Sequence, residues 1–146
     1  MKEYSNIFVA LDGTEAQRAV LSRAASIAAD NHAKLTMGHV VDSLPADANG
    51  GNPAALAREV RERLEDDLAA ELADIRANSD IADAELRVAA GPVIETLTQE
   101  LIANCKPDLV VCGERGLSNV KYAFVGSVST HLIRTMSCDV LVVKQR

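Results

Sequence analysis

The chain has 146 residues, the length of one ordinary domain, and residues 1–146 are interpreted as a single unit long enough to bury a core. Its composition, 48% hydrophobic and 25% charged, is typical of a folded globular domain and excludes a disordered chain. The formal net charge of −6 argues against a protein that grips the backbone of nucleic acid, because such proteins need a basic surface.

The first part of the chain predicts a strand over 6–12, a helix over 14–30 and a second strand over 34–41. The first strand reads NIFVALD, and its continuous apolarity is expected where helices cover both faces of a sheet. Thr14 is the predicted N-cap of the helix. A loop rich in proline and glycine follows the second strand.

Residues 53–78 predict one long amphipathic helix with Pro53 in its first turn. Charged residues fill the face that is expected to meet solvent. The apolar residues recur every three or four positions, as one helical face requires. They are Leu56, Val60, Leu64, Leu68, Leu72 and Ile75.

The remaining elements are predicted strands over 84–91, 108–113 and 139–144, and helices over 92–104 and 127–136. Strands that alternate with helices predict a doubly wound α/β domain, with a parallel sheet and helices on both faces. In such sheets ligands bind beyond the carboxyl ends of the strands, where the strand order reverses. The loops that follow the strands are therefore the places to look for a site.

The loop after the fourth predicted strand reads GERGLSNVKYAFVGS and spans residues 113–127. Gly113 and Gly116 follow a buried strand, where missing side chains let backbone N–H groups approach an anion. Gly126 and Ser127 precede a helix, whose N-terminus offers free amides and a partial positive charge. The same residues would also serve a plain turn and a helix cap, so their spacing alone leaves both interpretations open. The apolar middle of the loop favours a segment that folds down as a lid or forms a surface for a partner.

Asp12 ends the first predicted strand, at the expected crevice. Its carboxylate could accept hydrogen bonds from a ribose or an adenine amine, hold a metal ion, or only form an Asx-turn with the backbone of Gly13 and Thr14. His39 and His131 lie within a predicted strand and helix and are interpreted as core or surface residues rather than chemical groups.

Missing motifs argue against several other classes of protein. The sequence has no GxxxxGK[ST], the motif of a P-loop enzyme. The first strand leads into DGTE rather than GxGxxG, which argues against a dinucleotide-binding fold. A phosphoacceptor receiver domain would need clustered acids after the first strand and another Asp after the third, which ends in AAGP. A flavodoxin-type fold agrees in outline, but few aromatic residues are available to sandwich a flavin.

The pattern Gly113-x2-Gly116-x9-Gly126-Ser127 resembles the nucleotide-binding signature of the universal stress protein family, in its ATP-binding branch. The likeness covers nearly the whole chain, from a first strand ending in ALDGT, through GHVV, to CDVLVVK as the last strand. It implies an open sheet of five parallel strands in the order 3-2-1-4-5, of the adenine nucleotide alpha hydrolase type, with ATP between the first and fourth strands.

The resemblance also assigns roles to the matching positions. Asp12 would contact the nucleoside, with Ala10 and Leu11 lining that side, and Val40 would meet the adenine through its backbone. The residues that would hold ribose and phosphates are Cys112, Gly113, Gly116, Gly126, Ser127, Val128 and Ser129. Apart from the resemblance, the carboxylate of Glu114 would repel phosphates unless it binds Mg²⁺ or points outward. Arg115 and Lys121 could offset it, and each could equally be an ordinary surface charge.

The function implied is that of a stress-response nucleotide sensor that binds ATP, or ADP, AMP or cyclic AMP, with Mg²⁺, for which Asp12 is a candidate ligand. Two alternatives stay open: a dimeric interaction module independent of nucleotide, and a slow ATPase or autophosphorylating protein. No lysine lies within the glycine motif at the position that fast phosphoryl transfer uses, so rapid turnover is not expected.

Family members commonly dimerise by pairing their last strands, so a homodimer is expected. In this chain the paired strand would be the apolar run Val140, Leu141, Val142 and Val143. An apolar strand at an exposed edge of a sheet can pair with the same strand of a second chain.

Three cysteines, Cys105, Cys112 and Cys138, form neither a CxxC pair nor an even set, which favours buried, reduced thiols. The apolar run 7–11 is too short for a signal peptide, and no run approaches membrane-spanning length. We therefore expect a cytoplasmic protein without membrane insertion.

Overall fold

The computed structural model describes residues 3–43, 51–114 and 127–144. Its core is a five-stranded sheet in the order β3-β2-β1-β4-β5, with every neighbouring pair parallel. This confirms the predicted fold class. The strands are β1 (Asn6–Leu11), β2 (Lys34–Asp42), β3 (Asp83–Gly91), β4 (Leu109–Gly113) and β5 (Asp139–Val143).

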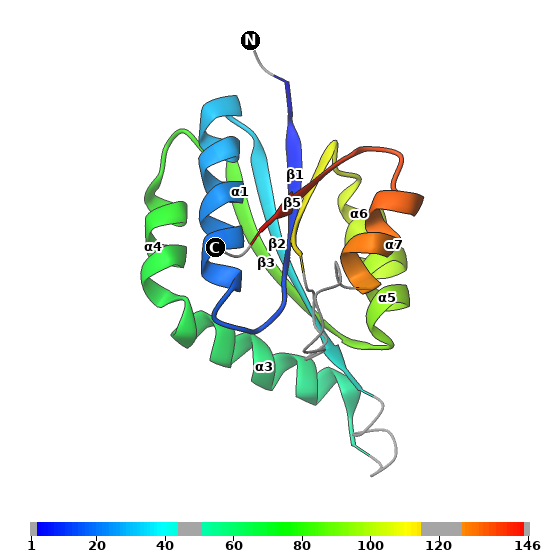
Figure 1. The fold of residues 1–146 in the computed structure, drawn as a ribbon. Coiled ribbons are helices and arrows are strands. Elements are labelled where there is room, and N and C mark those ends of the chain that lie inside the picture. The colour runs from blue at the N-terminus through cyan, green and yellow to red at the C-terminus, as the bar shows by residue number, and fades with distance from the viewer. Residues whose placement is uncertain (1–2, 44–50, 115–126, 145–146) are drawn as a thin grey trace.

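Helices cover both faces of the sheet (Figure 1). One face carries α1 (Gln17–Asn31), α3 (Pro53–Asp67) and α4 (Ala69–Ala77). The other carries α7 (Ser127–Thr135) and the helical segment that follows β3. β1 leads to a helix on one face and β4 to a helix on the other, so the strand order reverses between them. This is where a doubly wound sheet opens a crevice at its carboxyl edge.

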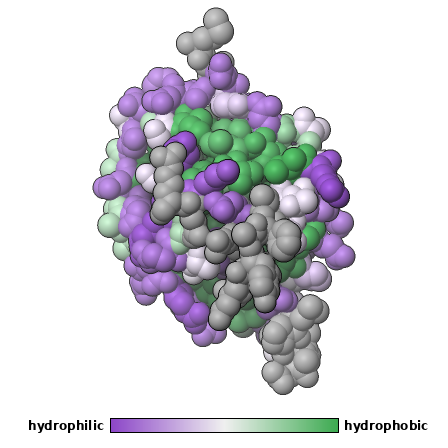
Figure 2. Space-filling view, viewed as in Figure 1, coloured by the Kyte–Doolittle hydropathy of each residue, from purple (hydrophilic) through white to green (hydrophobic). Residues whose placement is uncertain are grey.

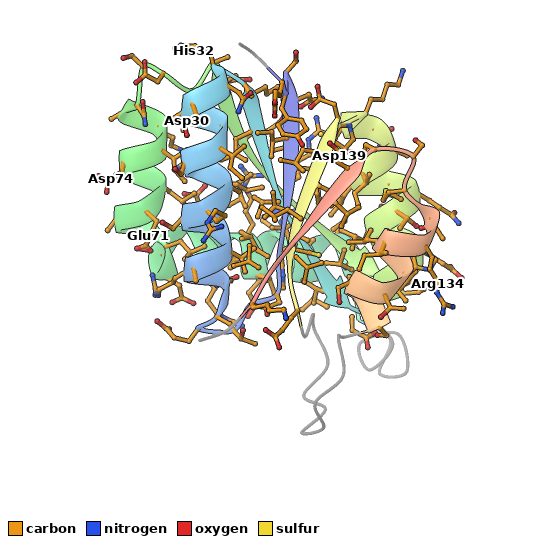
Figure 3. The ribbon with its side chains drawn as sticks, turned by 45° about the horizontal axis from the view of Figure 1, so that its top comes forward. Asp30, His32, Glu71, Asp74, Arg134 and Asp139 are labelled. Carbon is orange, nitrogen blue, oxygen red and sulfur yellow. The ribbon has the colours of Figure 1, made fainter. Side chains whose placement is uncertain are left out.

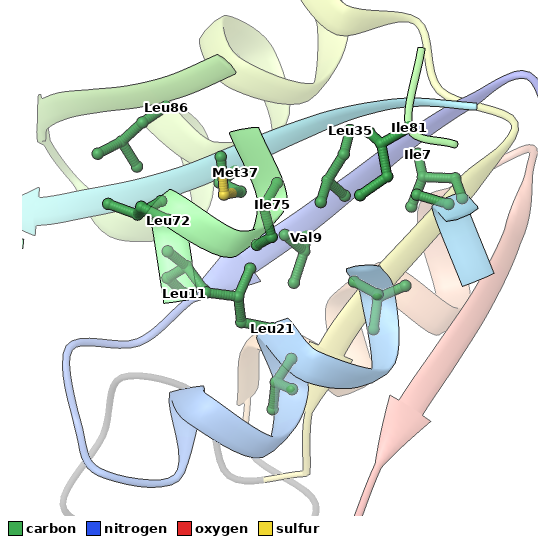
Figure 4. Close-up of a cluster of buried hydrophobic side chains, with 14 of the residues drawn as sticks. Ile7, Val9, Leu11, Leu21, Leu35, Met37, Leu72, Ile75, Ile81 and Leu86 are labelled. Atoms are coloured by element: carbon green, nitrogen blue, oxygen red, sulfur yellow. The ribbon is translucent and has the colours of Figure 1, made fainter. Parts of the chain in front are cut away.

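β1 lies at the centre of the sheet, and its continuous apolarity is explained by burial on both faces. Ile7 and Val9 pack into the core under α1 and α4, whereas Phe8 packs into the core under α7. All three side chains are fully buried. Figure 4 shows the first of these cores, in which Leu11 lies close to Leu21 of α1. β1 therefore lies between two separate apolar cores, and side chains of both cores pack against it.

The predicted helix 14–30 begins later than expected, at Gln17, and the prediction that Thr14 caps it was wrong. Ala16 occupies the N-cap position and makes no side-chain cap. The hydroxyl of Thr14 instead donates to Asp12 Oδ1 at 2.7 Å. The charged carboxylate, two residues away, satisfies this hydroxyl before the helix begins.

The predicted single helix 53–78 is two helices, α3 and α4, separated at Leu68. Leu68 leaves the helical conformation, with φ −107° and ψ 21°, while its side chain is fully buried. Arg18 of α1 holds the break: its guanidinium donates to the carbonyl of Asp67 at 2.9 Å and pairs with Glu71 of α4. α3 crosses the carboxyl edge of the sheet, and α4 turns to lie beside α1 (Figure 1).

The predicted helix 92–104 is helical, but its central part is wider than an α-helix. It consists of α5 (Val93–Glu95), the π-helical segment η1 (Thr96–Ile102) and α6 (Ala103–Cys105). The buried side chain of Thr96 fills the space above Gly91, where a Cβ atom would lie 2.3 Å from Thr96 Oγ1. Gly91, the last residue of β3, therefore leaves the space that the Thr96 side chain occupies.

Polar side chains tie the amino-terminal edge of the sheet together, away from the crevice. The carboxylate of Asp108 accepts the backbone N–H groups of Ser5 and Asn6, at 2.8 and 3.0 Å. Tyr4 donates its hydroxyl to Asp139 Oδ2 at 2.7 Å, which links the start of β1 to that of β5. Figure 3 shows Asp139 at this edge. Within the described part of the chain, no helix is long and apolar enough to span a membrane.

Candidate nucleotide site at the ends of β1 and β4

The turn that follows β1 is fixed by hydrogen bonds to its backbone. Asp12 Oδ1 accepts the backbone N–H of Thr14 at 2.8 Å, in addition to the hydroxyl already described, so the Asx-turn left open by the sequence is present. Gly13 adopts φ +79°, and its N–H donates to the buried side chain of Gln17 at 2.9 Å. This turn sets Asp12 at the edge of the crevice.

His39 of β2 supports the same turn from below. Its side chain is buried, and Nδ1 lies 2.8 Å from the carbonyl oxygen of Leu11, the residue opposite it in the sheet register. A carbonyl only accepts, so Nδ1 carries the proton and donates it. The ring also lies under Gly13, where a Cβ atom would come within 3.2 Å of Cε1. His39 is thus a buried residue, one of the two positions the sequence left open, and it also fixes the backbone beside Asp12.

Burial lowers the pKa of His39, although the bond to the Leu11 carbonyl and the charge of Asp12 both act to raise it. The unfolded chain then binds a proton more readily than the folded one below about pH 6.5. The stability that neutral His39 contributes is full above that pH and is lost as the pH falls toward the lowered pKa.

We therefore expect the wild-type protein to lose more free energy of unfolding between about pH 7 and about pH 5 than the variant His39→Asn, which has no titrating group at this position. Urea unfolding at each pH measures the difference. Equal losses in the two proteins would show that His39 does not carry this linkage.

The exit of β4 and the start of α7 lie against each other. The hydroxyl of Ser129, fully buried, donates to the carbonyl of Glu114 at 3.2 Å, and the N–H of Glu114 donates to the carbonyl of Val143 in β5. The strand exit and helix start that the glycine motif was predicted to bring together are therefore adjacent. Ser127, the first residue of α7, is exposed.

A small cavity of about 20 Å³, the central cavity, lies between these elements. It is lined by seven of the predicted site residues and by two residues that the sequence analysis did not single out. The seven are Ala10, Leu11, Asp12, Val40, Cys112, Gly113 and Val128. The two others, Gly38 and Leu97, come from the middle of β2 and from η1. An isolated glycine inside a strand signals close approach of other atoms, so Gly38 could have been found from the sequence.

Cys112 lies in this wall as an inert group. Its side chain is 2% exposed, and burial raises the pKa of its thiol to about 11. A thiol with so high a pKa stays protonated at neutral pH and is a poor nucleophile. Cys112 therefore shapes the site by packing and does not supply chemistry.

Two wider hollows open on either side of the central cavity, and Asp12 lines both. The first, the α3-side cavity, has a volume of about 370 Å³ and lies between the end of β2 and α3. The second, of about 670 Å³, lies between α1 and the ends of β4 and β5, with Gly113 and Glu114 in its wall. Asp12 thus lines the central cavity and both of these hollows.

Three of the predicted site residues, Arg115, Gly116 and Gly126, lie outside the described residues, as does Lys121. Among the residues that the structure describes, no three His, Cys, Asp or Glu side chains gather as a metal site. Of the described residues that line the central cavity, Asp12 is the one that carries a carboxylate.

Fold and site together define a doubly wound parallel α/β protein with its crevice at the ends of the first and fourth strands. The model of the universal stress protein family matches residues 3–144. The chain belongs to the universal stress protein family.

Relatives and solved structures agree with this assignment. A Staphylococcus saprophyticus relative named for the universal stress proteins is 31% identical over 144 residues, which cover 99% of this chain and 86% of the relative. The universal stress protein UspA from Lactobacillus plantarum has a TM-score of 0.68 at 24% identity, covering 98% of this chain and 99% of that one.

Two of the similar structures hold an adenine nucleotide. One is a universal stress protein in complex with cAMP, with a TM-score of 0.63 and 28% identity over 97% of each chain. The other is the universal stress protein from Archaeoglobus fulgidus in complex with dAMP, with a TM-score of 0.64 and 20% identity, covering 97% of this chain and 98% of that one.

Proposed function

We propose that this protein is a cytoplasmic stress-response sensor that binds an adenine nucleotide, ATP foremost, at the crevice between β1 and β4. The observation that carries the proposal is the meeting of β4 and α7: Ser129 of the helix donates to Glu114 at the strand exit, and Gly113 and Val128 line one cavity with Asp12. Backbone amides at a strand exit and at a helix start are the groups that bind phosphate.

The family assignment supports the same ligand class, because the similar structure with 28% identity holds cAMP. The glycine motif, with Arg115, Gly116, Gly126 and Ser127, would hold the phosphates. Mg²⁺ usually binds through one or two carboxylates together with the phosphates of the nucleotide, so Asp12 is enough to contribute to a Mg²⁺–ATP site.

Calorimetric titration with ATP, AMP and cyclic AMP tests the proposal, with Ala10→Leu as the blocking variant. A leucine side chain exceeds the central cavity of about 20 Å³ and must protrude between the strand ends. We expect wild-type binding and at least about a tenfold loss in Ala10→Leu, since each factor of ten corresponds to about 1.4 kcal/mol.

The matched control is Ala84→Leu, which enlarges another half-buried alanine, at the amino-terminal end of β3 opposite Leu35 and away from the crevice. Circular dichroism checks that both variants fold. Absence of heat with every nucleotide would instead favour an interaction module that works without nucleotide. Equal affinity in the two variants would move the site elsewhere.

We also propose that the protein forms a homodimer through β5. This strand is one edge of the sheet, and Val140, Leu141, Val142 and Val143 are only half-buried. Figure 2 shows hydrophobic surface on the side where β5 crosses the front of Figure 1. An exposed apolar edge strand is a template for pairing with another chain.

Sedimentation at micromolar concentration is expected to give the mass of a dimer for the wild type and a monomer for Val142→Lys, because the lysine places a charge in the paired edge. Ala89→Lys on β3, the opposite edge, is the control and should remain dimeric. A monomeric wild type, or a Val142→Lys variant that stays dimeric, would contradict pairing through β5.

A further inference from the structure

The α3-side cavity is large enough for a nucleobase, whereas the central cavity is not. Its volume of about 370 Å³ falls within the range of small-ligand sites, while about 20 Å³ holds roughly one water molecule. Asp12 and Val40 line both cavities, so the two lie next to each other at the carboxyl edge of the sheet. A nucleotide with its phosphates at Gly113 and α7 would therefore have room for its base on the α3 side.

His39 forms part of the wall of this cavity and presents one defined nitrogen to it. Nδ1 is occupied by the carbonyl of Leu11, which fixes the proton there and leaves Nε2 with a lone pair. Among the described residues Nε2 has no hydrogen-bond partner, and none of their buried side-chain nitrogens or oxygens lacks one. Nε2 therefore reaches the cavity, where it acts as a hydrogen-bond acceptor.

The charges around the cavity favour a ligand that donates hydrogen bonds. Among the described residues, the carboxylates of Asp12, Asp42 and Asp67 line it, against one guanidinium, that of Arg63. Nη2 of Arg63 lies 3.6 Å from Oε1 of Glu59, one turn earlier on α3, so its charge is already paired. Burial also keeps His39 neutral near pH 7 by lowering its pKa. An anionic group, or a carbonyl oxygen turned toward Nε2, would meet lone pairs and negative charge here.

We propose that Nε2 of His39 accepts a hydrogen bond from the exocyclic amino group of the base, and so selects 6-amino purines over 6-oxo purines. This inference rests on the proposed function and adds the residue that determines base specificity. Adenine carries the amino group that Nε2 needs, whereas hypoxanthine and guanine carry an oxygen at the same position. A 6-oxo base would leave Nε2 without a hydrogen-bond donor, and an unpaired polar group in a site strongly lowers the affinity for the wrong base.

The test compares the affinities for ATP and inosine triphosphate in the wild type and in His39→Asn. The asparagine amide can keep the donor to the Leu11 carbonyl but has no atom at the place of Nε2. We expect the wild type to prefer ATP by about tenfold or more, and His39→Asn to bind both nucleotides with nearly equal affinity.

His32→Asn provides the matched control. His32 also places Nδ1 near a backbone carbonyl, that of Asp80 at 3.2 Å, but lies at the far end of α1 (Figure 3). Its φ of 51° is a conformation that asparagine tolerates. This variant should keep the wild-type preference, and thermal unfolding shows whether each variant is folded.

Nitrogen NMR of labelled histidine gives a second readout, assigned by the signal that His39→Asn removes. The inference requires the Nδ1–H form in the free protein and a shift of the Nε2 signal on addition of ATP but not of inosine triphosphate. Equal wild-type affinity for the two nucleotides, or a preference that survives in His39→Asn, overturns the inference and leaves the proposed function standing. If no nucleotide binds the wild type, the proposed function fails and the base-specificity inference falls with it.

Discussion

Gly38→Ala is expected to lower the free energy of unfolding by about 1–3 kcal/mol, although it adds a single methyl group, because overpacking a full core forces its neighbours to move. A Cβ atom on Gly38 would lie 2.2 Å from Cζ of Phe8, whose ring is fully buried. The ring cannot swing away, since it is packed within the core under α7. Urea unfolding measures the loss.

A double-mutant cycle with Phe8→Leu identifies the cause. The smaller side chain removes the ring atoms that the new methyl group meets, so Gly38→Ala should cost less in the Phe8→Leu background than in the wild type. Gly113→Ala is the control, because its Cβ would come no closer than 3.3 Å, to Val20 Cγ2. The explanation fails if Gly38→Ala is neutral, or if its cost is the same with and without the ring.

Leu68→Ala is expected to cost about 2–5 kcal/mol, the usual range for emptying a fully buried leucine site. Leu68 sits at the break between α3 and α4, and its side chain is 0% exposed in the core under α1. Truncation removes the apolar anchor that fixes the direction in which α4 leaves α3. Thermal or urea unfolding gives the change.

Leu56→Ala tests the same substitution on the same predicted apolar stripe, but Leu56 lies in the first part of α3 and is only half-buried. We expect it to cost less than half as much as Leu68→Ala. If the two substitutions cost the same, the two residues would share one uninterrupted helical face, as the sequence alone predicts, and the break would carry no structural role.

The spacing of apolar residues predicted every strand and the position of nearly every helix, because burial on one or two faces leaves a direct mark on the sequence. It did not predict the break at Leu68. The stripe continues through that position without a change of period, since Leu64 and Leu68 are both buried. Spacing indicates that a face is buried but not which element covers it, and here α3 packs on the sheet whereas α4 packs against α1 as well as the sheet.

The site was predictable in so far as it depends on position along the chain. Asp12, Gly113 and Val128 could be placed at strand and helix ends, and the structure brings them to one cavity. The part played by His39 was not predictable, because it depends on the register that sets Leu11 opposite it across two strands. The proton on Nδ1 follows from that long-range contact and leaves no local pattern in the sequence.

The polar ties among Tyr4, Ser5, Asn6, Asp108 and Asp139 have a consequence for how the protein can diversify. They anchor the strands at the edge opposite the crevice, so the frame does not depend on the loops that meet the ligand. Those loops are therefore free to be exchanged, lengthened or retuned for a new chemical signal while the scaffold beneath them remains intact.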